Sequence, residues 1–277
     1  MDAPCEIQGS IHVFRLVNNM CPGKWVHISF RAFLRIFANN LQTKGNYMDF
    51  KKYETFLCEE LTRIVLEIIN ENKQLEISAR ARAGAEISDF LEGKFKEKVN
   101  DEKVSRFIYD AAQSPQGKTK NPWDARCKFN YMNREEEVWI DFKAIKISSV
   151  DSNPDIGTPS KIISFIKDGN FYLVYIIVYY VGIESGLQFE EYNEKFVKTY
   201  LLKDVNHSFR LNPKPQLQVN ISAEPEYRTR EEFIKLLIQK MQESYTRQET
   251  SIIKKKEKLV SLLPELIKSN EESEKRD

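Results

Sequence analysis

Residues that bind soft metals or act as activated nucleophiles are scarce in this chain. Its 277 residues include three histidines, and its four cysteines are too widely spaced for a CxxC pair: Cys5, Cys21, Cys58 and Cys127. Structural zinc sites usually need closely spaced ligand pairs. No histidine neighbours a serine or cysteine nucleophile in an arrangement recognisable as a catalytic triad. The pattern argues against a zinc-stabilised domain and a triad hydrolase, and favours the reduced thiols of a cytoplasmic protein.

Glycine-rich loops and long apolar runs are also missing. Gly9, Gly23, Gly45 and Gly117 form no phosphate-cradling loop, so no nucleotide-binding motif is present. The longest apolar run, residues 171–183, is too short to cross a bilayer as a helix. The N-terminus lacks the basic and then apolar pattern of a signal peptide. We therefore expect a soluble, intracellular protein that makes no membrane contact.

Neither sign of charge is in excess. Lysine and arginine number 42 and aspartate and glutamate 41, for a net charge of +1. This balance argues against a protein that binds nucleic acid or membranes by bulk electrostatics. It leaves room for a DNA enzyme, because basic groove walls and an acidic metal site offset each other in the sum. Hydrophobic residues at 41% are enough for a packed core and exclude global disorder.

Apolar residues at helical spacing predict helices towards both ends of the chain. Three are expected over residues 29–41, 50–72 and 79–99. Near the C-terminus, Thr229 and Glu232 form a capping-box pattern that opens another helix, and a second one should cover roughly 250–268. In between, we expect Ser160 to cap a short helix through Ile166.

The central part of the chain has the composition of β-structure. Alternating residues predict a hairpin of strands 123–131 and 137–147 with its turn at 133–136. Residues 171–181 are continuously apolar, which is typical of a strand buried on both faces. Shorter strands are expected near 196–203 and 216–221. We therefore divide the chain into a mostly helical region 1–78, an α/β core 79–222 and C-terminal helices 223–277, all within one continuous domain.

Three charged residues of the predicted hairpin form the strongest candidate for a chemical site. Asp141 and Lys143 are two apart on the second strand and so project from the same face, opposite Ile140, Phe142 and Ala144. Asp124 lies on the first strand. Two carboxylates suit Mg²⁺, which would stabilise charge on a phosphate and activate a bound water. With Lys143 to orient that water or neutralise charge, the set is sufficient for phosphodiester hydrolysis.

A simpler interpretation is that Asp141 and Lys143 form an ion pair on a solvated edge strand. Short D-x-K patterns occur by chance in many proteins. Here the pattern stands in an otherwise apolar strand, where unpaired charges would be costly. Asp124 also follows Asn121-Pro122-Trp123, a turn that would place it at the start of a strand.

This layout resembles the PD…(D/E)xK nuclease superfamily, and within it the type II restriction endonucleases. The matching residues are Pro122-Trp123-Asp124, in which Trp123 separates the proline from the acid, and Asp141-Phe142-Lys143. The segment from Arg80 to Glu92 is similar to the R-x-R-A-G-x-x-x-E helix of many such enzymes. The helix acid should fall at Ser88, so that Glu86 or Asp89 must serve, or the helix acid is absent. The resemblance covers residues 79–180.

The resemblance implies a mixed central β-sheet flanked by helices, with helical N-terminal and C-terminal segments, and a bacterial or archaeal cytoplasmic enzyme. It further implies dependence on Mg²⁺, 5′-phosphate products and usually a homodimer. We assign Asp124 and Asp141 to the metal, and Lys143 and Glu86 to the same catalytic set. One such set per chain suggests that two chains cut the two strands. The C-terminal helices would supply apolar surface for that contact, or else pack on their own sheet.

Basic residues cluster beside Asp124 and are expected to contact DNA phosphates: Lys118, Lys120, Arg126 and Lys128. A solvated loop explains them equally well. Taken together, the sequence predicts a Mg²⁺-dependent, sequence-specific endonuclease that cuts double-stranded DNA as a restriction enzyme. Two alternatives stay open: a repair or junction-resolving nuclease of the same superfamily, and a non-catalytic DNA- or protein-binding module.

Overall fold

The computed structural model describes residues 49–76, 83–114 and 123–274, with side chains up to residue 269. The chain divides into two units, residues 1–49 and 50–277, and all elements described below belong to the second. The helix expected over residues 29–41 lies outside the described residues, as do Lys118, Lys120 and Pro122.

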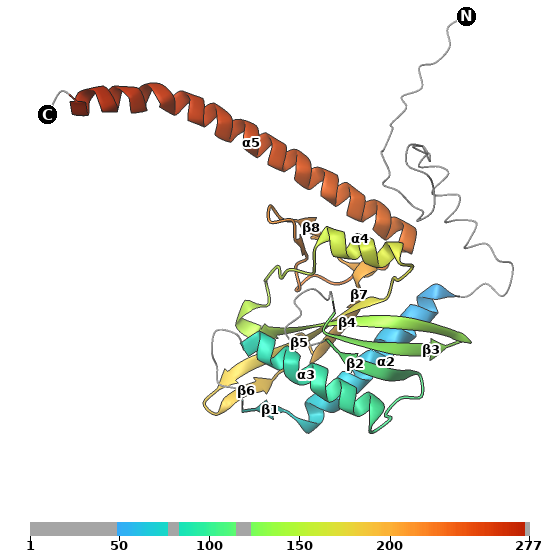
Figure 1. Ribbon diagram of the computed structural model, residues 1–277. Coiled ribbons are helices and arrows are strands. Elements are labelled where there is room, and N and C mark those ends of the chain that lie inside the picture. The colour runs from blue at the N-terminus through green and yellow to red at the C-terminus, as the bar shows by residue number, and fades with distance from the viewer. Residues whose placement is uncertain (1–48, 77–82, 115–122, 275–277) are drawn as a thin grey trace, which may run out of the picture. The chain divides into compact units, whose positions relative to one another are not determined.

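A mixed seven-stranded sheet forms the centre of this unit (Figure 1). Its order is β1-β6-β5-β4-β3-β2, and β7 also pairs with β5. The pair β4 and β5 is parallel, and the other pairs are antiparallel. The strands are β1 (Gln74–Leu75), β2 (Ile108–Gln113), β3 (Ala125–Tyr131), β4 (Arg134–Lys146), β5 (Leu173–Ile183), β6 (Gly186–Phe189) and β7 (Val197–Leu201).

The strand β5 is the centre of the sheet, as its continuous apolar sequence predicts. Its residues from Leu173 to Tyr180 are all buried. Along one edge β5 pairs with β4, and along the other it pairs with β7 through residues 174–178 and then with β6 through residues 180–183. Neighbours on both edges and helices on both faces leave no place for a polar side chain, which explains the run of apolar residues.

The hairpin of β3 and β4 is confirmed, but its turn lies earlier than the polar residues suggest. Met132 and Asn133 form the turn, with φ of 53° and 59°, and Tyr131 pairs with Arg134. Two positive φ angles in a two-residue connection fit the right-handed twist of the flanking strands. The expected turn at 133–136 is therefore wrong in position, since Glu135 and Glu136 already belong to β4.

Helices cover both faces of the sheet, which confirms the predicted fold class. On one face lie α2 (Phe50–Glu71) and α3 (Ala83–Asn100), where the rings of Phe95 and Phe142 are 6.1 Å apart. On the other face β5 packs in a buried cluster against two helices and a small second sheet. The helices are α4 (Pro159–Lys167) and the first part of α5 (Arg230–Glu274), and the small sheet consists of β8 (Arg210–Leu211) and β9 (Leu217–Gln218). The domain boundaries at 78 and 222 stay a prediction.

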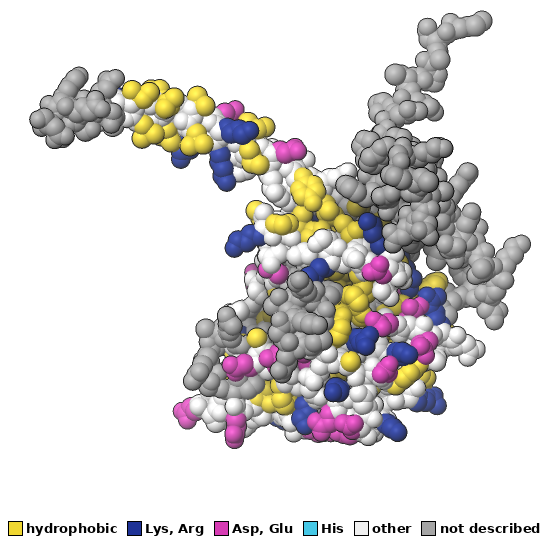
Figure 2. Space-filling model, viewed as in Figure 1, with side chains coloured by type: hydrophobic (Ala, Val, Ile, Leu, Met, Phe, Trp, Pro, Cys, Tyr) yellow, Lys and Arg dark blue, Asp and Glu magenta, His cyan; other side chains and the backbone are white. Residues whose placement is uncertain are grey.

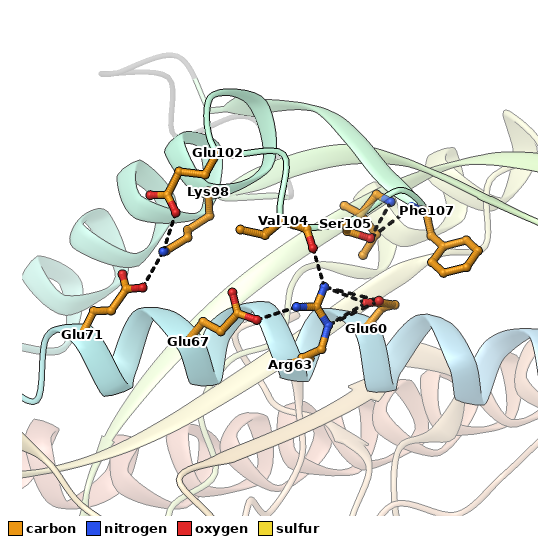
Figure 3. A network of polar contacts seen from close by, with 10 residues as sticks. Glu60, Arg63, Glu67, Glu71, Lys98, Glu102, Val104, Ser105 and Phe107 are labelled. Atoms are coloured by element: carbon orange, nitrogen blue, oxygen red, sulfur yellow. Dashed lines mark hydrogen bonds and ion pairs between the residues drawn. The ribbon is translucent and has the colours of Figure 1, made fainter.

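Polar contacts hold α2 against the end of α3 (Figure 3). Lys98 of α3 lies 2.6 Å from Glu71 and 2.6 Å from Glu102. Arg63 of α2 bonds to Glu60 and Glu67 on its own helix and donates to the carbonyl oxygen of Val104, 2.9 Å away, in the loop after α3. These contacts fix α3 at its C-terminal end, and its N-terminal end therefore meets β4 in a defined position.

Two helix expectations need correction. The capping box of Thr229 and Glu232 forms, with Glu232 accepting from the Thr229 N–H at 2.7 Å. However, the two helices expected after it are one continuous helix, because no glycine or proline stands near residue 250 to end the first. In α4, Thr158 is the N-cap residue and Pro159 the first helical one, so that Ser160 does not cap the helix.

None of the helices in the described part of the chain combines the length and apolar character needed to cross a membrane.

Candidate active site

The candidate site lies where β3 stops covering the edge of β4. The pairing of the two strands reaches Ala125 and Ile140, so that β4 continues without β3 from Asp141 onwards. At this open edge the N–H of Phe142 donates to Asp124 Oδ2 at 2.7 Å, and the carbonyl oxygen of Phe142 accepts from Ser88 Oγ at 3.1 Å. Side chains thus replace the strand that is missing, which satisfies the buried backbone.

The start of α3 comes very close to this edge. A Cβ atom on Gly84 would lie 3.2 Å from the carbonyl oxygen of Ala144, which is tighter than ordinary contact. The glycine therefore permits the approach that brings Ser88, one turn further along α3, to the backbone of β4. The Ala83-Gly84 pair of the helix motif has a packing role here.

Asp124 is held firmly although it lies one residue before β3. Its N–H donates to the carbonyl oxygen of Ile140 at 2.8 Å, and its own carbonyl oxygen accepts from the N–H of Ser114 at 2.7 Å. With the carboxylate bonded to Phe142, both the backbone and the side chain are fixed relative to β4. Such fixing is what a metal ligand or a catalytic group needs.

Asp141 and Lys143 lie together as the period of the strand predicts. Their Oδ1 and Nζ atoms are 2.5 Å apart, and their side chains are 14% and 26% exposed. Ile140 and Phe142, between and beside them, are buried on the opposite face. Among the described groups, Asp141 Oδ1 has no hydrogen-bond partner beyond this ion pair. This oxygen therefore still has a lone pair that could bind a cation.

The carboxyl groups of the site have raised pKa values. Burial, and then the charge of Asp141, raise the pKa of Asp124 to about 7. Burial also raises the pKa of Asp141, although Lys143 opposes the shift. On α3, burial together with Asp124, Asp89 and Asp141 raises the pKa of Glu92 to about 8. These shifts reflect poor solvation first and, for Asp124 and Glu92, repulsion by neighbouring acids second.

Lys143 stays charged in these surroundings. Burial by itself would lower its pKa, but Asp141, and to a lesser degree Asp124 and Asp155, outweigh burial and raise it. Lys143 is the one cation that lowers the pKa of either Asp124 or Asp141 in the described residues. One lysine therefore faces several acids, and the raised pKa values mean that part of these acids stays protonated near neutral pH in the free protein.

The donors present fit a hard divalent cation held by few protein ligands. All of them are carboxylate oxygens, which Mg²⁺ prefers, and one buried oxygen of Asp141 has no hydrogen-bond partner among the described groups. Within the described ranges no three histidine, cysteine or acidic side chains converge as a ready cage for a metal. This also fits Mg²⁺, which usually takes one or two carboxylates together with waters and substrate phosphates.

An acid on α3 that sequence reasoning did not consider, Glu92, also lies near the site. Glu86 lies exposed in the first turn of α3, and the charges that act on Asp124 and Glu92 include Asp89 but not Glu86. Glu92 is partly buried and feels both Asp124 and Asp141. It stands four residues after Ser88, on the same face of the helix. The sequence shows an acid one turn beyond the expected position, but its approach to the site depends on how α3 packs on β4.

The structure describes two of the four basic residues that were predicted to contact DNA. Arg126 is exposed on β3, where it lies 3.4 Å from Glu137 and 5.8 Å from the ring centre of Trp123. Lys128 lies 3.6 Å from Glu135 and 3.9 Å from Asp110. Both are close in sequence to Asp124, and each already has acidic partners. Lys118 and Lys120 lie outside the described residues.

Comparison with known proteins adds one finding. A family model, described as SwaI-like, SwaI restriction endonuclease, matches residues 49–262. The match spans the sheet, α2 to α4 and more than half of α5, and it includes all residues of the site. A search of curated proteins gave no significant match.

Proposed function

The chain belongs to the family of SwaI-like restriction endonucleases, and from this premise we propose that it cuts double-stranded DNA at a specific sequence with Mg²⁺ held by Asp124 and Asp141. As a member of this family it is a restriction enzyme, and hence a nuclease that acts on DNA. The observation that carries the proposal is the fork between β3 and β4, where both carboxylates are fixed beside Lys143.

Asp124 and Asp141 are proposed to bind the metal from two directions. The Phe142 N–H orients the carboxylate of Asp124, and the ion pair with Lys143 orients that of Asp141. When bound, Mg²⁺ would lower the pKa of a coordinated water and neutralise charge on the scissile phosphate. The raised pKa values of the acids mean that cation binding relieves a repulsion already present in the free protein.

Lys143 is proposed to act at the reacting phosphate. Its ammonium is charged, lies at the site and is partly exposed, so that it can donate to a water or a phosphate oxygen. In the free protein it neutralises Asp141. Once a divalent cation shares the Asp141 carboxylate, the ammonium is released from part of that attraction and can stabilise the charge that develops on the phosphate.

Glu92 is proposed as the acid on the helix that supports the metal site. Its carboxyl has a pKa of about 8 because burial and three neighbouring acids disfavour its ionisation. A cation between Asp124 and Asp141 would lower that pKa, so that Glu92 ionises when the metal binds. The carboxylate could then accept hydrogen bonds from waters on the metal and keep them oriented.

A homodimer is proposed because one chain carries one such site. A duplex has two strands, and a two-fold pair of subunits on a palindromic sequence presents one site to each strand.

Digestion of a long duplex of known sequence tests the proposed function. With Mg²⁺ we expect discrete fragments whose sequenced ends share one motif and carry 5′-phosphates; with EDTA we expect none. The Asp141→Ala variant should give no fragments while keeping its circular dichroism spectrum. Cleavage of branched DNA alone would indicate a junction-resolving nuclease, and binding without cleavage a non-catalytic module. Robust cleavage in EDTA, or by the variant, would overturn the proposed site.

A further inference from the structure

The second half of α5 makes no contact with the rest of the described protein that would bury it. Phe233, Leu237 and Ser244 are buried in its first half, but from Glu249 to Ser269 every residue except the half-buried Leu262 is exposed. Apolar side chains cover this part of the helix in Figure 2. Seven of them are 51% to 73% exposed: Ile252, Ile253, Leu259, Val260, Leu263, Leu266 and Ile267.

These apolar residues follow a pattern that reads the same in both directions. Leu259 and Val260 precede Leu263 by four and three residues, and Leu266 and Ile267 follow it by three and four. Spacings of three and four place all five on one face of a helix. A stripe with this symmetry can pack against the same stripe of a second chain when the two helices are antiparallel and cross at Leu263.

The charges around the stripe have the opposite sign on its two sides. Residues 254–258 hold four lysines and one glutamate, for a net charge of +3, whereas residues 265–274 hold four glutamates and one lysine, for a net charge of −3. The mirror positions of Lys254 and Lys255 about Leu263 are Glu272 and Glu271. An antiparallel copy would therefore bring opposite charges together, and a parallel copy would bring like charges together.

We propose that residues 252–274 of α5 are a self-association element, in which two copies of this chain pair as antiparallel helices about Leu263. The inference names the contact of the proposed homodimer and does not depend on the catalytic assignment. Most of the element lies beyond residue 262, where the family match ends. Burying the stripe in both copies removes on the order of 1,000 Å² of surface, the lower range for a specific interface.

Pairing at this distance from the sheet leaves the catalytic edge uncovered. In the antiparallel pair, the two points at which α5 leaves its own body, near Gln248, lie 30 residues apart along the paired helices, which at 1.5 Å per residue is about 45 Å. The two bodies are thus held apart by the pair, and the open edge of β4 stays accessible to DNA in both.

Light scattering of the full-length protein tests the element directly. For the wild type we expect the mass of two chains of 32.5 kDa. Leu263→Asp should give the mass of one chain and weaken pairing at least about 100-fold, because two carboxylates would meet in an apolar contact. Ser261→Asp introduces the same charge two residues away, about 200° around the helix, and should leave the dimer intact. Thermal unfolding should be unchanged in both variants at monomeric concentration.

Charge reversal tests the antiparallel direction. Lys254→Glu with Lys255→Glu, and Glu271→Lys with Glu272→Lys, should each weaken self-pairing, while an equimolar mixture of the two variants should form a heterodimer in native mass spectrometry. A monomeric wild type would show that another part of the chain, or nothing, covers the stripe, and would overturn the proposal. A dimer that survives Leu263→Asp, is lost with Ser261→Asp or fails to reform in the mixture would overturn it as well.

Discussion

Two of the places where a lysine of this protein lies beside two carboxylates are largely buried, and they differ in what surrounds the three charges. At the fork of β3 and β4, Lys143 lies 2.5 Å from Asp141, with Asp124 near by. Between α2 and the end of β7, Lys203 lies 2.9 Å from Glu54 and 2.7 Å from Asp204. We call the first set the fork cluster and the second the helix cluster.

The helix cluster has enough positive charge to balance its acids. Lys203 also donates to the carbonyl oxygen of Arg228 at 2.7 Å, and Asp204 accepts from the N–H of Arg228 at 2.8 Å. Arg228 lowers the pKa of Asp204, and Arg230 that of Glu54, although burial raises both overall. Glu54 Oε2, like Asp141 Oδ1, is buried without a hydrogen-bond partner beyond its ion pair among the described groups, but here two arginines add positive charge to that of the lysine, and the cluster is built into the packing of α2.

The fork cluster has acids in excess. Among the described residues Lys143 is the one cation that lowers the pKa of Asp124 or Asp141, and Asp89 and Glu92 add two further carboxyl groups, of which Glu92 is mostly protonated at pH 7. Residue types alone do not separate the two clusters, since both contain a lysine and two acids. The clusters differ in their balance of acids against cations and in the open strand edge, and a fixed set of acids with too few cations is a candidate site for a metal ion.

The largest expected contrast between the clusters comes from removing each lysine. Lys143→Met should lower the cleavage rate by about 10³-fold or more, because it removes a positive group from the reacting phosphate. The fold should persist, since this side chain is at the edge of the sheet. Cleavage kinetics and thermal unfolding of the purified variant measure both effects.

Lys203→Met is the matched control in the helix cluster. It leaves Glu54 and Asp204 buried without their shared cation and should lower the free energy of unfolding by about 3–5 kcal/mol. The cleavage rate per folded molecule should stay near that of the wild type. A stable Lys203→Met protein that fails to cut, or an active Lys143→Met protein, would reverse the roles given to the clusters.

The pH dependence of the metal-free protein sharpens the contrast further. Burial raises the pKa of Asp124 to about 7 and of Glu92 to about 8, so that folding favours their protonated forms. Their contribution to stability is therefore complete at acidic pH, below their unfolded pKa values, and is lost as pH rises through 7 and 8. In EDTA, the Tm should fall as pH rises from about 5 to about 8 and then level off, and the rise in Tm caused by Mg²⁺ should grow over the same range.

Glu92→Gln isolates the acid on the helix. The variant should lose the upper part of this pH dependence, and the Mg²⁺ concentration for half-maximal cleavage should rise about 10-fold. The same substitution at Glu86 separates the two helix acids. If Glu86→Gln raises the Mg²⁺ requirement and Glu92→Gln does not, Glu86 is the supporting acid and Glu92 only a buried neighbour.

The smallest expected effect concerns DNA contacts outside both clusters. Arg126 is exposed and its ion pair with Glu137 is long, so that the arginine can turn to a phosphate at little cost. Arg126→Ala should weaken DNA binding at every sequence and reduce the slope of log affinity against log salt by about 1. Arg210→Ala, on the separate β8–β9 sheet, is the control. Equal slopes for all three proteins would remove Arg126 from the DNA-binding set.

Much of the fold followed from the sequence because its signals are local. The apolar run of β5, the alternation in β4 and the capping box of Thr229 each predict an element through neighbouring residues alone. The turn at Met132 was missed because positive φ angles at a methionine carry little composition signal. The continuity of α5 was missed because a shift in surface polarity near residue 250 resembles a boundary between helices.

The alternation of side chains along a strand predicted only part of the candidate site. Asp141 and Lys143 share a face by that period, whereas the position of Asp124 depends on where β3 ends relative to β4. Glu92 reaches the site through the packing of α3 on the open edge, which Gly84 allows and which no spacing rule contains. The balance of charge in the helix cluster likewise depends on residues far apart in the sequence.

The most direct test of the account compares Asp141→Asn with Glu54→Gln, one isosteric change in each cluster. Both variants would be loaded with cleavable duplex in Ca²⁺ and started with excess Mg²⁺, and the single-turnover rate of cleavage would be measured. If the fork of β3 and β4 holds the metal, we expect a loss of about 10³-fold or more for Asp141→Asn and a rate within about twofold of the wild type for Glu54→Gln. Cleavage by Asp141→Asn at a rate near that of the wild type would contradict the assignment of the metal to the fork of β3 and β4.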